Sequence, residues 1–237
     1  MRNATHLRVL GNEQAALKCL LEAWRANPGS ATLSTEIIRV FGEQRDIEKA
    51  IEIFDVFNNN GNDVHLPYVI NILADILERN DEKKRAKEYL QNMPLFISSN
   101  DAMDTAIIAK RLGDFSLAHR YFEKAGEVLL TDVRAMHEFA QVKIGMVKQH
   151  RKNRYHNQTS INRLLKEAQA LLERVLQMNA PTTRLAWVWR DLGRVFHFSK
   201  APNKQVLGAY QKAIELLPNE KTFPRELKDL ALKQTKD

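Results

Sequence analysis

The chain has 237 residues, of which 44% are hydrophobic and 27% are charged, and its formal net charge is +7. This much apolar side chain excludes a disordered chain, and nine glycines and seven prolines are too few for a turn-rich all-β fold. The single cysteine, Cys19, excludes an intramolecular disulfide and a cysteine-based zinc site, and it is typical of a reducing compartment. With a polar N-terminus and no long apolar run, the sequence predicts a cytoplasmic protein without a membrane span.

Apolar residues return every three or four positions from the first segments onward, which predicts helices. Residues 15–24 and 50–57 show this spacing, and an alternation with period two is not sustained. Laid over one another, the segments repeat a small residue, a large residue four positions later and a third apolar residue after that. In chain order the sets are Ala16, Leu20 and Ala23; Ala50, Phe54 and Phe57; Ala86, Leu90 and Met93; Ala118, Phe122 and Ala125; Ala168, Leu172 and Val175; and Val206, Tyr210 and Ala213.

This repeat has a physical reason in the packing of helix pairs. A small residue where two antiparallel helices cross lets their backbones approach, and the large residue one turn later fills the groove against the next helix. Pro28 and Pro218 follow the first and last sets, where proline ends a helix because it cannot donate a backbone hydrogen bond. We therefore expect large residues such as Phe54, Phe122 and Trp189 to lie in the core rather than around a cofactor.

The last repeat is the most complete one. It reads Trp189-x-x-Leu192-Gly193-x-x-Phe196 and is followed by Tyr210, Ala213 and Pro218. This order is similar to that of the tetratricopeptide repeat (TPR) family, in which Trp-x-x-Leu-Gly-x-x-Tyr precedes Ala, an aromatic residue, Ala and Pro. Other parts of the same pattern are matched by Gly11, Ala16, Leu20, Ala23 and Pro28, and by Gly113, Asp114, Phe115 and Ala118. The resemblance implies an all-α solenoid of about six TPR-like helix pairs that form a right-handed superhelix, with a C-terminal capping helix.

The resemblance covers residues 1–220, and residues 221–237 are expected to form the capping helix and a tail. The six units are expected at about 1–30, 31–64, 65–97, 98–131, 132–180 and 184–220. Because the fifth unit is longer than the others, we expect an extended helix and an exposed basic insertion at about 145–162. The first unit begins inside its first helix, so one alternative is that the chain is a piece of a longer protein.

Most of the net positive charge lies in one window, residues 143–174. Its cations are Lys143, Lys148, Arg151, Lys152, Arg154, Arg163, Lys166 and Arg174, against the acids Glu167 and Glu173. A candidate strand-contact surface for a nucleic acid consists of Lys148, Arg151, Lys152 and Arg154, with Tyr155 for stacking. A run of charges is also typical of a solvated helix face, so both interpretations stay open at this point.

The sequence lacks the motifs that carry catalysis. It contains no Gly-rich phosphate loop, no His-Glu-x-x-His and no Gly-x-Ser-x-Gly, and no two of its seven histidines lie four residues apart. We therefore expect no catalytic residue, no metal and no cofactor. The protein is predicted not to be an enzyme.

The resemblance implies a concave groove lined by the first helix of each pair, which in this family meets a peptide. Transferring the groove positions to this chain gives Arg39, Asn71, Asp75, His137, Gln141, Trp187, Arg190 and Arg194 as candidate partner-binding residues. Arg190 and Arg194 lie one helical turn apart, so their planar forks suit a carboxylate or phosphate beside Trp187. The alternative is that both arginines pair with acids on neighbouring helices.

These features favour a non-catalytic protein–protein interaction scaffold that binds a peptide segment or a partner domain in the groove. One alternative is a nucleic-acid-binding module that uses the basic residues 143–174. A further alternative is the regulatory or sensor region of a larger signalling protein. The sequence does not identify the partner.

Overall fold

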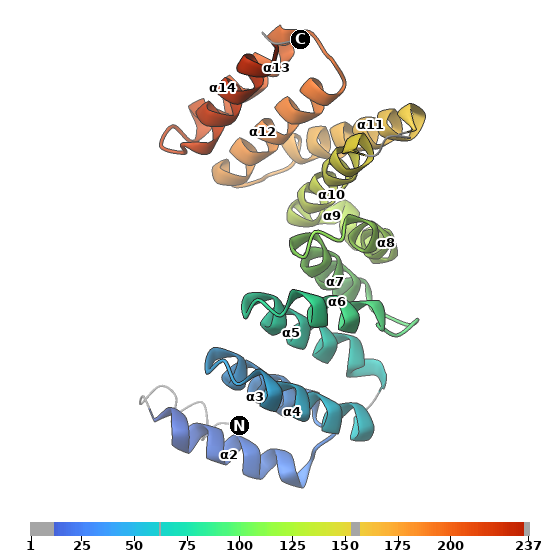
Figure 1. Cartoon of the computed structure of the whole chain (residues 1–237), viewed down its shortest axis with the longest axis vertical. Coiled ribbons are helices and arrows are strands. Elements are labelled where there is room, and N and C mark those ends of the chain that lie inside the picture. Colours follow the sequence, from blue (N-terminus) through green and yellow to red (C-terminus); the bar gives the residue numbers. More distant parts are fainter. Residues whose placement is uncertain (1–11, 62, 153–156, 235–237) are drawn as a thin grey trace. The chain divides into compact units, whose positions relative to one another are not determined.

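A computed structural model describes residues 12–61, 63–152 and 157–234 of the chain. Within these residues all regular structure is helical, and neighbouring helices pack against one another within each unit (Figure 1). The prediction of an all-α fold of adjacent helix pairs is confirmed. The partial first helix of the first expected unit, residues 1–10, lies outside the described part, and so do Arg154 and Tyr155 of the candidate strand-contact surface. The chain divides into two compact units between Leu117 and Ala118.

Short capping motifs begin and end the helices of the first unit. Ser30, Asp46 and Ser98 each accept a hydrogen bond from the backbone amide three residues later, which satisfies a donor at a helix start. α3 (Ala31–Glu43) and α5 (Leu66–Arg79) are followed by Arg45 and Asp81, whose positive φ angles of 59° and 66° turn the chain back for the next helix. The helices are α2 (Glu13–Ala26), α3 (Ala31–Glu43), α4 (Ile47–Asn60), α5 (Leu66–Arg79), α6 (Lys83–Gln91) and α7 (Ser99–Arg111), with the short 3-10 helix η1 (Asp63–His65) before α5.

The second unit contains the longest helices of the described chain. α8 (Phe115–Ala125) begins in the first unit and ends in the second. The others are α9 (Glu127–Thr131), α10 (Val133–Lys152), α11 (Gln158–Leu176), α12 (Thr182–Phe198), α13 (Asn203–Leu216) and α14 (Thr222–Gln234). The sequence did not predict η1 and α9, because five residues or fewer are too short to show an apolar period.

The small residues of the repeat occupy fully covered positions in both units. Ala50, Ala86 and Ala168 are each 0% exposed, and the large residues one turn later, such as Phe54 and Leu172, are buried as well. These are the positions at which a small side chain lets two helices approach. The small and large residues of the repeat therefore mark the core, as the sequence predicts, whereas Ala23, the third residue of the first set, is exposed.

α12 and α13 approach closely at Gly193. A Cβ atom at this position would lie 2.6 Å from Cε2 of Tyr210, so the tyrosine ring occupies the space that any other residue would fill. Tyr210 is fully buried in a cluster with Val206 and Phe223, the latter at the start of α14. The close approach holds the phenol ring between α12 and α14.

Some apolar side chains lie outside the core. Leu95 and Phe96 are 87% and 92% exposed in the loop between α6 and α7, although Met93 in the same loop is buried. Their exposure is local, because the neighbouring Pro94 and Ile97 are partly covered. In the part of the chain that the structure describes, no helix has the length and apolar character needed to cross a bilayer.

Candidate binding surfaces

A groove of about 410 Å³ opens between the C-terminal ends of α3 and α5 in the first unit. Gly42 allows the two helices to approach, since a Cβ atom there would lie 2.4 Å from Cγ2 of Ile76. The Asn80 amide joins the helices by donating to the carbonyl oxygens of Ile76 and Gly42, at 2.9 and 3.3 Å. The groove is lined by Arg39, Gly42, Glu43, Arg45, Ile72, Asp75, Ile76, Arg79 and Asn80.

Arg39 and Asp75, two of the candidate residues, both line this groove. Arg39 donates from Nη1 to Oε1 of Glu36 at 2.7 Å and from Nη2 to the Tyr68 hydroxyl at 3.4 Å. Asp75 forms ion pairs with Arg79, at 2.7 Å, and with Arg111 of α7. These side chains remain partly exposed, so the wall of the groove presents paired but accessible charges.

Asn71, a third candidate, has a different position. It is 3% exposed and donates from Nδ2 to the carbonyl oxygen of Asp101 at 2.9 Å. Its Oδ1 accepts a hydrogen bond from the Thr105 hydroxyl at 2.8 Å. Asn71 therefore connects α5 to α7 inside the unit rather than facing the groove.

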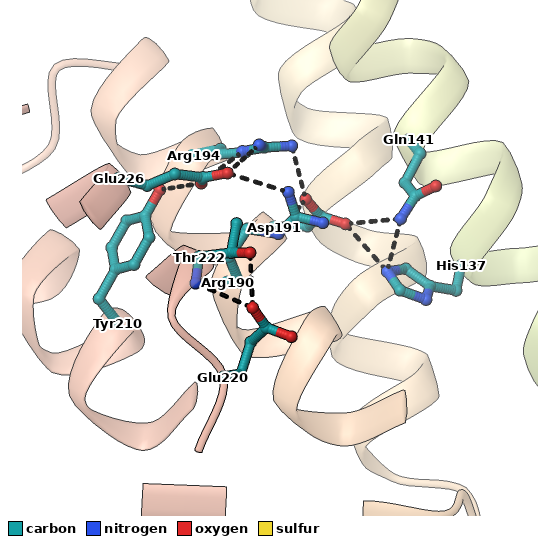
Figure 2. Close-up of polar contacts among 9 residues, drawn as sticks. All are labelled: His137, Gln141, Arg190, Asp191, Arg194, Tyr210, Glu220, Thr222 and Glu226. Atoms are coloured by element: carbon teal, nitrogen blue, oxygen red, sulfur yellow. Dashed lines mark hydrogen bonds and ion pairs between the residues drawn. The ribbon is translucent and has the colours of Figure 1, made fainter. Parts of the chain in front are cut away.

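In the second unit, the buried carboxylate of Asp191 contacts polar side chains of α10 and α12 (Figure 2). His137 Nε2 lies 2.9 Å and the Gln141 amide 3.0 Å from its Oδ2. Arg194 donates to Oδ1 at 3.3 Å, and Arg190 Nε lies 3.2 Å from Oδ1 without forming a directed hydrogen bond. Burial alone would raise the pKa of Asp191, but the bond to His137 and the charges of Arg190, His137 and Arg194 outweigh it and lower the pKa to about 2.

A second carboxylate, that of Glu226 on α14, completes the arrangement (Figure 2). Arg194 donates from Nε to its Oε2 at 3.1 Å and from Nη2 to its Oε1, so the guanidinium engages both oxygens. Arg190 Nη1 donates to Oε1 at 3.4 Å and the Tyr210 hydroxyl to Oε2 at 3.2 Å. Burial and then the charge of Glu226 raise the pKa of Tyr210, which keeps its hydroxyl protonated as a donor.

Trp187 lies beside this group of charges. The guanidinium carbon of Arg190 is 4.5 Å from the centroid of the Trp187 ring, a cation–π contact. Trp187 also packs edge-on against Phe223 of α14, at 4.9 Å between ring centroids. The structure thus brings together five candidates, His137, Gln141, Trp187, Arg190 and Arg194, and it places the two arginines in ion pairs, as the alternative interpretation expected.

The residues of the basic window have different surroundings. Lys143 is 4% exposed, pairs with Glu167 at 2.6 Å and lies over the Phe139 ring at 4.1 Å. Arg151 donates to the carbonyl oxygen of Phe198 and covers that residue's ring. Lys152 is exposed at the end of α10. Partial burial, and then the charge of Arg194, lower the pKa of Lys148, which lies on α10 near the arginines of α12.

Comparison with known proteins identifies the fold. No protein-family model and no curated protein matches the chain. Solved structures do match it: YrrB, described as a TPR protein with an unusual peptide-binding site, has a TM-score of 0.62 and 15% identity, over 92% of this chain and 98% of that one. PilF of Pseudomonas aeruginosa has a TM-score of 0.60 and 14% identity, over 96% and 95% of the two chains. Human IFIT1, solved as a dimer with PPP-AAAA, has a TM-score of 0.53 and 15% identity, over 86% of this chain and 46% of that one.

The chain has the tetratricopeptide-repeat fold. Identities of 12–16% to TPR structures show the fold and leave the ligand open. The TPR motif residues identified in the sequence therefore have a structural role, which agrees with the burial of Tyr210 and the close approach at Gly193.

The TPR pattern could not reveal the two acids of the second unit. Asp191 follows Arg190 directly, and its partner His137 is 54 residues away, so no local spacing signals the contact. The sequence gives only a weak indication that Glu226 faces the interior. It falls on the same face of α14 as the apolar residues Phe223, Leu227 and Leu230, which pack into one cluster.

Proposed function

We propose that this chain is a non-catalytic protein-interaction module that holds a peptide segment of a partner in the groove between α3 and α5. The observation that carries the proposal is the groove itself, an open volume of about 410 Å³ between the first helices of two neighbouring pairs. Ile72 and Ile76 supply apolar lining, and the ends of both helices supply charged groups. YrrB, which shares the fold, is described as having a peptide-binding site.

The charges of the groove indicate the chemistry of the peptide. The lining includes three arginines and two acids, namely Arg39, Arg45, Arg79, Glu43 and Asp75. A peptide with an acidic side chain complements this excess of positive charge. The apolar lining suits an aliphatic side chain next to that acid.

The geometry of the second unit also supports a non-catalytic function. His137 and Asp191 form a buried pair of the kind found in hydrolytic triads. The other ring nitrogen, Nδ1, lies 3.3 Å from Nη1 of Arg184, so in the described part of the chain a guanidinium stands where a nucleophile would be needed. We infer that the pair orients polar groups inside the fold.

Nucleic-acid binding through the basic window is the competing function. IFIT1, which shares the fold, was solved with PPP-AAAA. Against it, Lys143 and Arg151 are engaged by protein groups, which leaves fewer cations for phosphates than the sequence suggests. A titration with labelled single-stranded RNA at low and high salt separates the two functions. If the anisotropy of the RNA does not rise at low salt, nucleic-acid binding is excluded.

The peptide-groove proposal is tested by selecting peptides from a displayed library on the full chain and measuring their affinity by fluorescence anisotropy. We expect Arg39→Ala combined with Arg79→Ala to weaken the selected acidic peptides by about tenfold or more. The matched control is Arg163→Ala, an exposed arginine of the second unit, which should leave the affinity unchanged. If the double variant binds every selected peptide as well as wild type does, the groove is not the binding site.

A further inference from the structure

The face of α14 that packs against the rest of the second unit consists of apolar side chains and one acid. Phe223 is fully buried against Trp187, and Leu227 and Leu230 pack into the same cluster. Glu226 lies between them on this face and meets Arg190, Arg194 and Tyr210 (Figure 2). The opposite face is exposed, at Pro224, Arg225, Lys228 and Asp229. α14 is thus an amphipathic helix that docks through four side chains, spaced three, one and three residues apart.

The surface beneath α14 has the composition of a carboxylate-binding site. Two guanidinium groups and one phenol hydroxyl converge on both oxygens of Glu226. Tyr210 is fixed by its close contact with Gly193, and Arg190 by its contacts with Trp187 and Asp191. Contacts within α12 and α13 therefore contribute to holding Tyr210 and Arg190 in position, in addition to the contacts with Phe223 and Glu226 of α14.

The charges beneath α14 require an acid at this point. Arg190 and Arg194 both form ion pairs with two carboxylates, those of Asp191 and Glu226. Asp191 is also the hydrogen-bond partner of His137. Without Glu226, the single charge of Asp191 would face two guanidinium groups. The lowered pKa of Lys148, caused by partial burial and then by Arg194, agrees with an excess of positive charge here.

We propose that the surface of α12 and α13 beneath α14 is a docking site for an amphipathic partner helix with an aromatic residue, a glutamate three positions later and leucines four and seven positions after the aromatic. α14, with Phe223, Glu226, Leu227 and Leu230, is the built-in occupant, and a partner helix of the same pattern displaces it. The site goes beyond the peptide groove, because its side chains belong to the other unit and it binds a helix.

The first experiment measures binding of a fluorescein-labelled peptide of residues 220–234 to the full chain by anisotropy. In wild type the built-in α14 competes with the peptide. The full chain with Phe223→Ala and Glu226→Gln, which weakens the built-in helix, should bind the peptide about tenfold more tightly or better. A peptide carrying Glu226→Gln should lose about tenfold in affinity for that variant. Equal affinity of wild type and variant, with helical circular dichroism retained, overturns the proposal.

A second measurement does not require an altered chain. Hydrogen exchange of wild-type α14 is followed by mass spectrometry while an isotopically heavy peptide is added, so that the two copies of the sequence are distinguished. Faster exchange of residues 222–234 supports displacement, and unchanged exchange at saturating peptide overturns it. If the wild-type chain sediments as a dimer that Phe223→Ala disrupts, the occupant is a second copy and the assignment to a partner helix is wrong. Arg39→Ala with Arg79→Ala should leave this peptide's affinity unchanged, which separates the two sites.

Discussion

The hydroxyl of Tyr210 lies 3.2 Å from Oε2 of Glu226, and it reaches this carboxylate because its ring packs against a glycine. The glycine is Gly193 of the repeat motif, so a residue that serves helix packing also positions a polar group. A change at Gly193 should therefore affect both the stability of the second unit and the contact with α14.

Gly193→Ala should destabilise the chain by about 1–3 kcal/mol, because the added Cβ would lie 2.6 Å from Cε2 of Tyr210. The matched control is Gly208→Ala on α13, where nothing lies within 4 Å of an added Cβ. There the gain in helix propensity should stabilise by about 0.5–1 kcal/mol. Urea unfolding followed by circular dichroism measures both changes. A stable Gly193→Ala variant would show that the two helices can separate at no cost.

Asp191→Asn should destabilise the second unit by about 3–5 kcal/mol, because Arg190 and Arg194 would lose a buried counter-charge while the side-chain shape stays the same. Asp229→Asn, at an exposed position of α14, serves as the control and should change the stability by less than about 0.5 kcal/mol. Equal unfolding midpoints of the two variants would indicate that Asp191 does not hold the network together.

The stabilising effect of Asp191 should depend on pH in a definite window. Its pKa is lowered from 3.8 to about 2 in the folded chain, so the unfolded state binds a proton first as the pH falls. The contribution of this carboxylate, roughly 2 kcal/mol by linkage, is therefore complete above pH 3.8 and is lost as the pH falls towards 2. Measured from pH 6 downward, the stability difference between wild type and Asp191→Asn should narrow within this window. A constant difference would mean that the pKa of Asp191 is not lowered.

Two lysines of the basic window should respond differently to alanine. Lys143→Ala removes a buried stem over Phe139 and the partner of Glu167, and it should destabilise by about 1–3 kcal/mol. Lys152→Ala, at the exposed end of α10, should have an effect below about 0.5 kcal/mol. Differential scanning calorimetry of both variants gives the comparison. If Lys143→Ala leaves the stability unchanged, Lys143 has no structural role and is available to bind a phosphate.

Residue spacing predicted the fold because the spacing and the packing have the same physical origin. Ala50 and Ala86 are small where helices cross and are fully buried, and the fit of Tyr210 requires a glycine at Gly193. The positions of the polar candidate residues could be predicted only in part. Arg39 and Asp75 line a groove, whereas Asn71 is buried between α5 and α7. Helix register determines the direction of a side chain, but the partner that it meets comes from another helix.

The acids of the second unit were not predicted for the same physical reason. Arg190 and Arg194 were recognised as a pair of forks suited to a carboxylate, and the structure places Glu226 and Asp191 there. Which acidic side chain of α14 contacts the two arginines depends on how α14 folds back over α12. The connection between the helices determines this. The distance in sequence, 32 residues between Arg194 and Glu226, carries no periodic signal.

The exposed loop between α6 and α7 has a practical consequence. Chymotrypsin cleaves after large aromatic residues in accessible segments, and Phe96, with 92% of its surface open to solvent, stands between two helices. Limited digestion should therefore cleave the peptide bond after Phe96 before it cleaves after the buried phenylalanines. The two fragments could then be labelled independently of each other.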